Sequence, residues 1–168
     1  MTASIFGAAF DKLPRETQAA ISRQLRTRMV KYTTAMRRGY SPTKVVIIAD
    51  TPGPGRPNQP NYHHTPFYST KNSSLWLNKL LIEAEIPEKD LLWFNSTLAS
   101  GDPLNHVHID DLRTCGVKFI VLGGNAEKWF KAAAPDLPYE KVYHPQFAKR
   151  FKSKEPYELI NLLKEIAK

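Results

Sequence analysis

Cysteine and long apolar runs are both scarce in this chain, and each shortage excludes a class of protein. Cys115 is the only cysteine in 168 residues, so the chain can form no internal disulfide framework and no cysteine-ligated zinc or iron–sulfur site. The longest aliphatic runs, Val45–Ala49 and Phe119–Leu122, are far shorter than the ~20 apolar residues of a membrane span. The first residues lack the basic and then apolar pattern of a secretory signal. We expect an intracellular protein, in the cytoplasm or with the nucleoid or nucleus, that is neither secreted nor bound in a membrane.

The remaining composition is typical of a folded domain. Hydrophobic residues make up 42% and charged residues 24% of the chain, which argues against wholesale disorder. A chain of this length usually forms one domain and buries roughly two thirds of its unfolded surface. It contains no internal repeat and no linker. We therefore expect residues 1–168 to form one domain and a monomer, with residues 1–43 as a basic helical extension packed on it.

Positive charge is concentrated in two places. The formal net charge is +8, and residues 1–44 hold +7 of it, from nine Lys or Arg against Asp11 and Glu16. A second basic cluster near the end consists of Lys141, Lys149, Arg150, Lys152 and Lys154. Such patches favour a polyanionic partner, because neutralising phosphates releases counterions. The alternatives are a solvated face without a partner and, less favoured, a membrane-surface helix.

Apolar residues follow helical and strand spacing in turn along the chain. Five apolar residues at helical spacing (Ile21, Leu25, Met29, Tyr32 and Met36) predict a helix from Pro14 to about Arg37, with Arg23, Arg26 and Arg37 on the opposite face. Short apolar runs predict four strands, at 44–49, 91–95, 117–122 and 141–143. Further helices are predicted at 73–84, 110–115, 125–134 and 155–167, with Ser73 or Ser74 and Asn125 as candidate N-caps. This alternation predicts an α/β protein, a three-layer α/β/α sandwich around a four-stranded, mostly parallel sheet.

Polar side chains follow three of the predicted strands. Asp50 comes after the first, Asn95 ends the second and His144 follows the fourth. Ligands of parallel α/β sheets bind outside the carboxyl ends of the strands. The loop at 50–66 after the first strand contains five prolines, and a loop this long is usually functional or disordered. We expect a binding site at this edge of the sheet.

These residues, in their order along the chain, resemble the motifs of the uracil-DNA glycosylase superfamily. The matching segments are Ala49–Gly53 (ADTPG), Thr65–Phe67 (TPF), Leu91–Leu98 (LLWFNSTL), Val121–Ala126 (VLGGNA) and His144–Gln146 (HPQ). The superfamily has a first motif of the G-x-x-P-G or G-Q-D-P-Y type, a pocket phenylalanine, a strand that ends in Asn, and a late His-Pro-Ser motif. The resemblance extends from Lys44 to Phe151, about two thirds of the chain.

The resemblance implies an enzyme that hydrolyses the N-glycosidic bond of a base flipped out of DNA. This reaction builds positive charge on the sugar and negative charge on the leaving base, so a carboxylate near the sugar and a donor near the base both favour it. By resemblance, Asp50 would activate water and His144 would stabilise or position the leaving base. Asn95 and Thr51 would bind the pyrimidine edge, and Phe67 would stack on the base.

The segment after His144 would, by the same resemblance, enter the DNA groove. Phe147 would wedge into the base stack, and Gln146 would lie against the DNA. Lys149, Arg150 and Lys152 would hold phosphates. Four of these residues also have a structural interpretation: turn capping for Asp50 and Asn95, core packing for Phe67, and a hydrogen-bonded structural imidazole for His144.

Three departures from the family pattern bear on the substrate and the activity. Thr51 occupies a position that is acidic or an amide in other branches, and Gln146 replaces the serine of His-Pro-Ser. Gly53 replaces a tyrosine that in some branches screens out a 5-methyl group, so a larger 5-substituted pyrimidine fits. We expect a monofunctional glycosylase for uracil or a 5-modified pyrimidine, acting on single- or double-stranded DNA with water as nucleophile and no cofactor.

Two other functions fit the same residues. The first, favoured by Thr51 and Gln146, is a catalytically inactive glycosylase-like module that binds DNA or a base. The second is a base-modification enzyme that uses the same pocket. A metal site is not expected: His63, His64, His106 and His108 lie near no carboxylate with ligand-like spacing.

Overall fold

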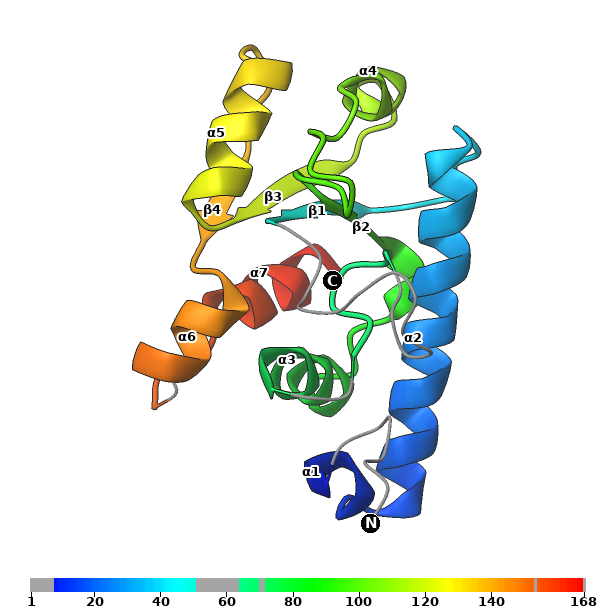
Figure 1. The fold of residues 1–168 in the computed structure, drawn as a ribbon, viewed down its shortest axis with the longest axis vertical. Helices are drawn as coiled ribbons and strands as arrows, with labels where there is room; N and C mark the ends of the chain where they lie inside the picture. The colour runs from blue at the N-terminus through cyan, green and yellow to red at the C-terminus, as the bar shows by residue number, and fades with distance from the viewer. Residues whose placement is uncertain (1–7, 51–63, 70–71, 153, 168) are drawn as a thin grey trace.

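A four-stranded parallel sheet organises the fold in the computed structural model, which describes residues 8–50, 64–69, 72–152 and 154–167. The strands are β1 (Val45–Ala49), β2 (Leu91–Asn95), β3 (Lys118–Leu122) and β4 (Glu140–Val142). Their order in the sheet is β2-β1-β3-β4, and every neighbouring pair is parallel. Figure 1 shows the sheet with helices on both sides, so the predicted α/β sandwich is confirmed.

The two faces of the sheet are buried in two separate cores. All five residues of β1 are buried, and its side chains alternate between the cores: Val45, Ile47 and Ala49 on one face, Val46 and Ile48 on the other. A continuous β-branched run, rather than an alternating one, is what a sheet covered on both faces requires.

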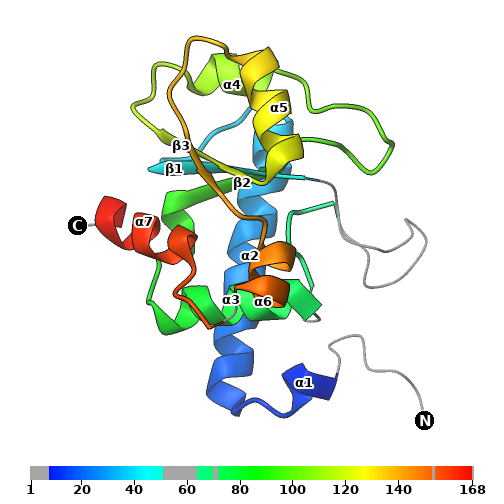
Figure 2. The ribbon, with the colours of Figure 1, turned by 90° about the vertical axis from the view of Figure 1, so that its left-hand side faces the viewer.

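Helices cover each face. α3 (Asn72–Glu83), α6 (Pro145–Phe151) and α7 (Glu158–Ala167) supply Leu77, Ala148 and Leu159 to the first core. α4 (Val107–Leu112) and α5 (Gly124–Ala133) supply Ile109 and Phe130 to the second. The two sets lie on opposite sides of the strands in Figures 1 and 2.

The first long helix, α2 (Arg15–Met36), follows the short helix α1 (Ala8–Asp11) and packs against β2, α3 and the 3-10 turn η1 (Glu88–Asp90). Ile21, Leu25 and Tyr32 of the predicted stripe are buried. Arg23, Arg26 and Arg37 are exposed, as their spacing predicted. Within the described ranges, no helix has both the length and the apolar character needed to cross a membrane.

Several element boundaries differ from the prediction. α3 already begins at Asn72, so Ser73 and Ser74 lie inside it and are not its caps. Asn125 also lies inside its helix, because the N-cap of α5 is Gly123, whose φ of 91° favours glycine. Other differences are that α4 spans 107–112 instead of 110–115, α7 begins at 158 instead of 155, and α6 was not predicted as a helix.

Candidate active site

The carboxyl ends of the strands bring the predicted catalytic residues to one edge of the sheet. Asp50 directly follows β1, Asn95 ends β2, and His144 comes two residues after β4. Ala49 is the register partner of Asn95. Pairing continues past both strands, because the N–H of Ser96 donates to the Ala49 carbonyl and that of Thr97 to the Asp50 carbonyl, each over 2.9 Å. Asp50 therefore leaves the sheet along a defined path.

The Asp50 carboxylate is held from the beginning of α5. Its Oδ2 accepts a hydrogen bond of 3.0 Å from Nδ2 of Asn125. The side-chain hydroxyl of Ser96 donates to the Asp50 carbonyl over 3.1 Å, so side chain and backbone are both fixed. The N-terminus of a helix favours a nearby negative charge. The sequence predicts Asn125 only as a helix cap, although its place just after β3 puts it at the same edge of the sheet as Asp50.

Asn95 lies buried beside the turn that carries Phe67. Only 2% of Asn95 is exposed, and its Nδ2 donates to the carbonyl of His64 over 3.4 Å. Leu91 and Trp93 of β2 belong to the first core, so alternation along the strand places Asn95 on the same face. Phe67 packs against that core as well. The amide and the ring therefore lie on one side of the sheet.

Phe67 and His144 are in contact. Their ring centroids are 5.6 Å apart, with planes inclined by 49°, and the Trp93 ring lies 5.7 Å from the Phe67 ring. Phe67 is half-buried and has a φ of 54°, an uncommon conformation for a residue with a side chain. Its carbonyl accepts hydrogen bonds from Nδ2 of Asn78 (3.1 Å) and Nη1 of Arg28 (3.4 Å). The surrounding structure thus holds Phe67 in a strained position.

His144 is the N-cap of α6. Its Nδ1 accepts a hydrogen bond of 3.1 Å from the backbone N–H of Gln146, so the proton of the neutral ring sits on Nε2. Burial lowers the pKa of His144, while the negative charge of Asp50 acts in the opposite direction. A Cβ on Gly123 would lie 3.3 Å from the Cβ of His144, so the turn after β3 lies against the base of this side chain. His144 is a partly buried, neutral donor near Asp50.

A buried ion pair, which the sequence analysis does not predict, lies behind the turn that carries Phe67. Arg28 of α2 binds Glu88 through two hydrogen bonds, of 2.8 and 3.2 Å, and its Nη1 also donates to the Pro66 carbonyl over 3.3 Å. Oε2 of Glu88 accepts a hydrogen bond of 2.7 Å from the Trp93 indole. The guanidinium lies 4.4 Å from the centre of the Trp93 ring. The sequence signal for this buried arginine is its spacing, because Arg28 falls on the same face of α2 as Ile21, Leu25 and Tyr32.

The predicted DNA-binding residues lie on α6 and just beyond it. Gln146, Phe147, Lys149 and Arg150 are exposed, and Lys152 is half-buried. The Phe147 ring is not isolated, because it contacts the rings of Tyr143 and Phe151. Thr51, the other predicted base-binding residue, lies outside the described residues.

Two of the histidines considered for metal binding, His106 and His108, have other side-chain partners. Nδ1 of His106 lies 2.9 Å from Asp110, and Nδ1 of His108 lies 2.8 Å from the Tyr40 hydroxyl; His63 is not among the described residues. In the part of the chain that the structure describes, no three His, Cys, Asp or Glu side chains gather as metal ligands.

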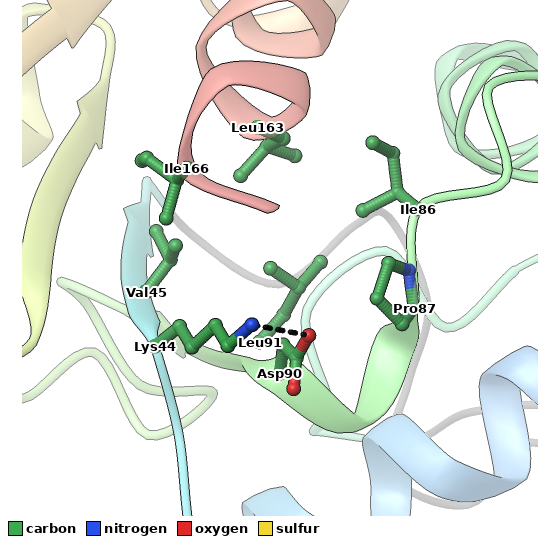
Figure 3. A pocket seen from close by; sticks show the side chains of 8 residues that line it. All are labelled: Lys44, Val45, Ile86, Pro87, Asp90, Leu91, Leu163 and Ile166. Atoms are coloured by element: carbon green, nitrogen blue, oxygen red, sulfur yellow. Dashed lines mark ion pairs between the residues drawn. The ribbon is translucent and has the colours of Figure 1, made fainter. Parts of the chain in front are cut away.

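A separate pocket lies at the other end of the strands. It is lined by aliphatic side chains of the β1 and β2 starts and of α7, with the Lys44–Asp90 ion pair (3.7 Å) at its rim (Figure 3). It contains none of the predicted site residues.

Comparison with known proteins yields no relative: the chain matches no family model, no curated protein and no solved structure.

Proposed function

We propose that the protein is a monofunctional DNA glycosylase that hydrolyses the N-glycosidic bond of uracil or a 5-modified pyrimidine flipped out of DNA. The observation that carries the proposal is that Asp50 and Asn95 come at the carboxyl ends of two paired strands, at the same edge of the sheet as His144, whose ring contacts Phe67. They offer a carboxylate, an amide, an aromatic ring and a neutral imidazole N–H. Cleavage of a flipped pyrimidine nucleotide uses all four groups.

Asp50 acts on the sugar side of the bond. Its carboxylate orients a water molecule and stabilises the positive charge that develops at C1′. The C1′–N bond breaks with both electrons going to the base, the water oxygen bonds to C1′, and a water proton passes to the carboxylate and then to solvent. The hydrogen bond from Asn125 fixes one carboxylate oxygen, which keeps the group aimed during the reaction.

His144 acts on the base side. The cap bond at Nδ1 leaves the proton on Nε2, and burial favours the neutral ring. A preorganised neutral donor stabilises the anionic base as charge develops on its carbonyl oxygen, without giving up its proton.

Asn95 and Phe67 supply recognition. A buried amide combines a donor and an acceptor, which matches the edge of a pyrimidine, and the half-buried Phe67 ring on the same side of the sheet offers a stacking surface. A buried amide whose ligand lacks the matching group is left without partners, so the site discriminates between bases.

The proposal is tested by a cleavage assay on labelled oligonucleotides. The panel contains uracil, 5-hydroxymethyluracil, thymine opposite guanine, and modified cytosines, with alkali treatment to break abasic sites. We expect cleavage of at least one substrate, and a loss of about 100-fold or more in Asp50→Asn, on the scale of a removed acid–base group. The matched control is Asp136→Asn, an exposed aspartate after the far end of α5, which should cut like the unmodified protein.

Two outcomes would contradict the proposal. One is Asp50→Asn cutting as fast as the unmodified protein. The other is tight DNA binding with no cleavage of any substrate on the panel, which would favour a module that binds a base without cutting it.

A further inference from the structure

Three exposed aromatic rings form a row beside the candidate site. Tyr143, Phe147 and Phe151 are 53%, 41% and 64% exposed. Neighbouring ring centroids are 4.9 Å apart for Tyr143 and Phe147, and 5.0 Å for Phe147 and Phe151. Among the described residues, the only other large hydrophobic side chain this exposed is Val30, on α2. Contiguous exposed rings of this kind mark an interaction surface.

The row has a firm support. Pro145 and Ala148 of α6 are buried, and Ala148 belongs to the first core. Phe147 and Phe151 are four residues apart, so they lie on one face of the helix. The Tyr157 hydroxyl donates to the Tyr143 carbonyl over 2.5 Å, which fixes the chain just before the helix. In Figure 1 this helix lies at the outside of the molecule, with its end directed away from the sheet.

The charge around the row indicates which partner it fits. The Arg150 guanidinium lies 5.9 Å from the centre of the Phe151 ring, and Lys152 and Lys154 follow in the chain. Lysine is depleted in the cores of protein–protein interfaces, whereas rings beside cations match the bases and phosphates of a nucleic acid strand. Bases inside a duplex are stacked on one another, so only unpaired bases present their faces to such rings.

We propose that Tyr143, Phe147 and Phe151 form a stacking platform for unpaired bases of single-stranded DNA that leads to the active site. The platform begins at the residue before His144, so a strand lying along it continues to the candidate site at the strand ends. This inference rests on the proposed function, and it names the substrate class as single-stranded or locally opened DNA. Phe147 is then the middle ring of three rather than a lone wedge.

Binding to undamaged DNA tests the platform separately from cleavage. Fluorescence anisotropy would measure the affinity of the full chain for labelled oligo(dT) and for a duplex of equal length at the same salt concentration. We expect tighter binding to oligo(dT). Phe151→Leu and Tyr143→Leu keep an apolar side chain but lose the ring, and each should weaken oligo(dT) binding by about tenfold, the scale of one lost base stack. Duplex binding should change less than twofold.

Val30→Ala is the matched control, because it truncates an exposed apolar side chain far along the sequence on α2. It should leave both affinities unchanged, and thermal melting should show that every variant remains folded. Equal loss of oligo(dT) and duplex binding in the ring variants, or no loss at all, would overturn the platform. The platform would also be overturned if a second copy of the chain covered the rings. Sedimentation velocity would then show a dimer that dissociates in Phe151→Leu, while DNA binding stays unchanged.

The two proposals can fail separately. Ring-dependent oligo(dT) binding by a protein that cleaves no substrate would retain the platform and reject the glycosylase. If cleavage depends on Asp50 but the ring variants bind oligo(dT) normally, the glycosylase is retained and the platform is rejected.

Discussion

Asn125 shows how one side chain can connect two strand ends. It lies in the first turn of α5, after β3, and its amide reaches the carboxylate that follows β1. The bond explains how a carboxylate just beyond the end of β1 can keep a fixed orientation. Asn125 does not fill the N-cap position, which belongs to Gly123. We therefore assign it a positioning role: it acts through Asp50.

Changing Asn125 should lower kcat more than it weakens DNA binding. Asn125→Ala removes the donor, and we expect about a tenfold loss in the single-turnover cleavage rate with an unchanged Kd for DNA. Asn125→Asp sets a like charge beside Asp50, and the loss should be at least about tenfold larger because the carboxylates repel each other. The control is Asn161→Ala, on an exposed part of α7. Equal effects of the Ala and Asp variants would contradict this electrostatic role.

His144 connects the active site to the pH dependence of stability. Its folded-state pKa is lowered from 6.5, chiefly by burial, and so is that of His108, also by burial. Between the lowered pKa and 6.5, the unfolded chain binds more protons than the folded one. The contribution of these two histidines to the free energy of unfolding is therefore complete above pH 6.5. It decreases as the pH falls towards the folded-state pKa, by at most about 1.4 kcal/mol per pH unit for each histidine.

His144→Asn should reduce this pH dependence without removing the helix cap. Asparagine is a good N-cap and does not titrate, so the backbone N–H of Gln146 keeps an acceptor. Urea unfolding at pH 7.5 and 5.5 would show a smaller difference in the variant than in the unmodified protein. An identical difference in both proteins would show that His144 does not contribute.

Strands were easier to predict than short helices, and α6 shows why. The buried runs of β1 and β2 are continuous and apolar, a pattern with few competing interpretations inside an α/β alternation. α6 has only seven residues, too few for a periodic apolar stripe. Its signals were local: a capping side chain at His144 and proline at the first helical position. The edge shared by Asp50, Asn95 and His144 followed from the parallel topology. The spacing of Arg28 and the place of Asn125 after β3 indicate where these two residues lie, but not which side chains they contact.

The helical form of α6 separates two of its basic residues. At about 100° per residue, Arg150 lies about 60° from Phe147 around the helix axis, whereas Lys149 lies about 160° away. Arg150→Gln should therefore lower the slope of log K against log salt for single-stranded DNA by about 0.7, the value of one phosphate contact. Lys149→Gln, its neighbour of equal charge, should lower the slope by less than half as much. Equal slopes for the two variants would mean that DNA does not follow the ring face.

At the scale of the whole molecule, α2 joins the basic N-terminal segment to the candidate site. Its exposed arginines lie on the outer face, but Arg28 points inward and is 1% exposed. It binds Glu88 of η1, lies over Trp93 of β2 and donates to the Pro66 carbonyl. One guanidinium therefore connects a helix, a strand and the turn that carries Phe67. The helical extension predicted for residues 1–43 includes part of the folded framework.

Removing Arg28 should destabilise the whole domain. Arg28→Met leaves Glu88 buried and unpaired, and we expect a loss of about 3 to 5 kcal/mol in the free energy of unfolding, measured with urea. The double variant Arg28→Met/Glu88→Gln removes both charges, while the carbonyl of the introduced amide still accepts from the Trp93 indole. It should recover more than half of the loss, because a neutral buried group escapes the cost of an isolated charge. If the double variant is as unstable as Arg28→Met, charge pairing does not stabilise the region. The stabilising contacts would then be the packing of the guanidinium on Trp93 and its hydrogen bonds to the turn that carries Phe67.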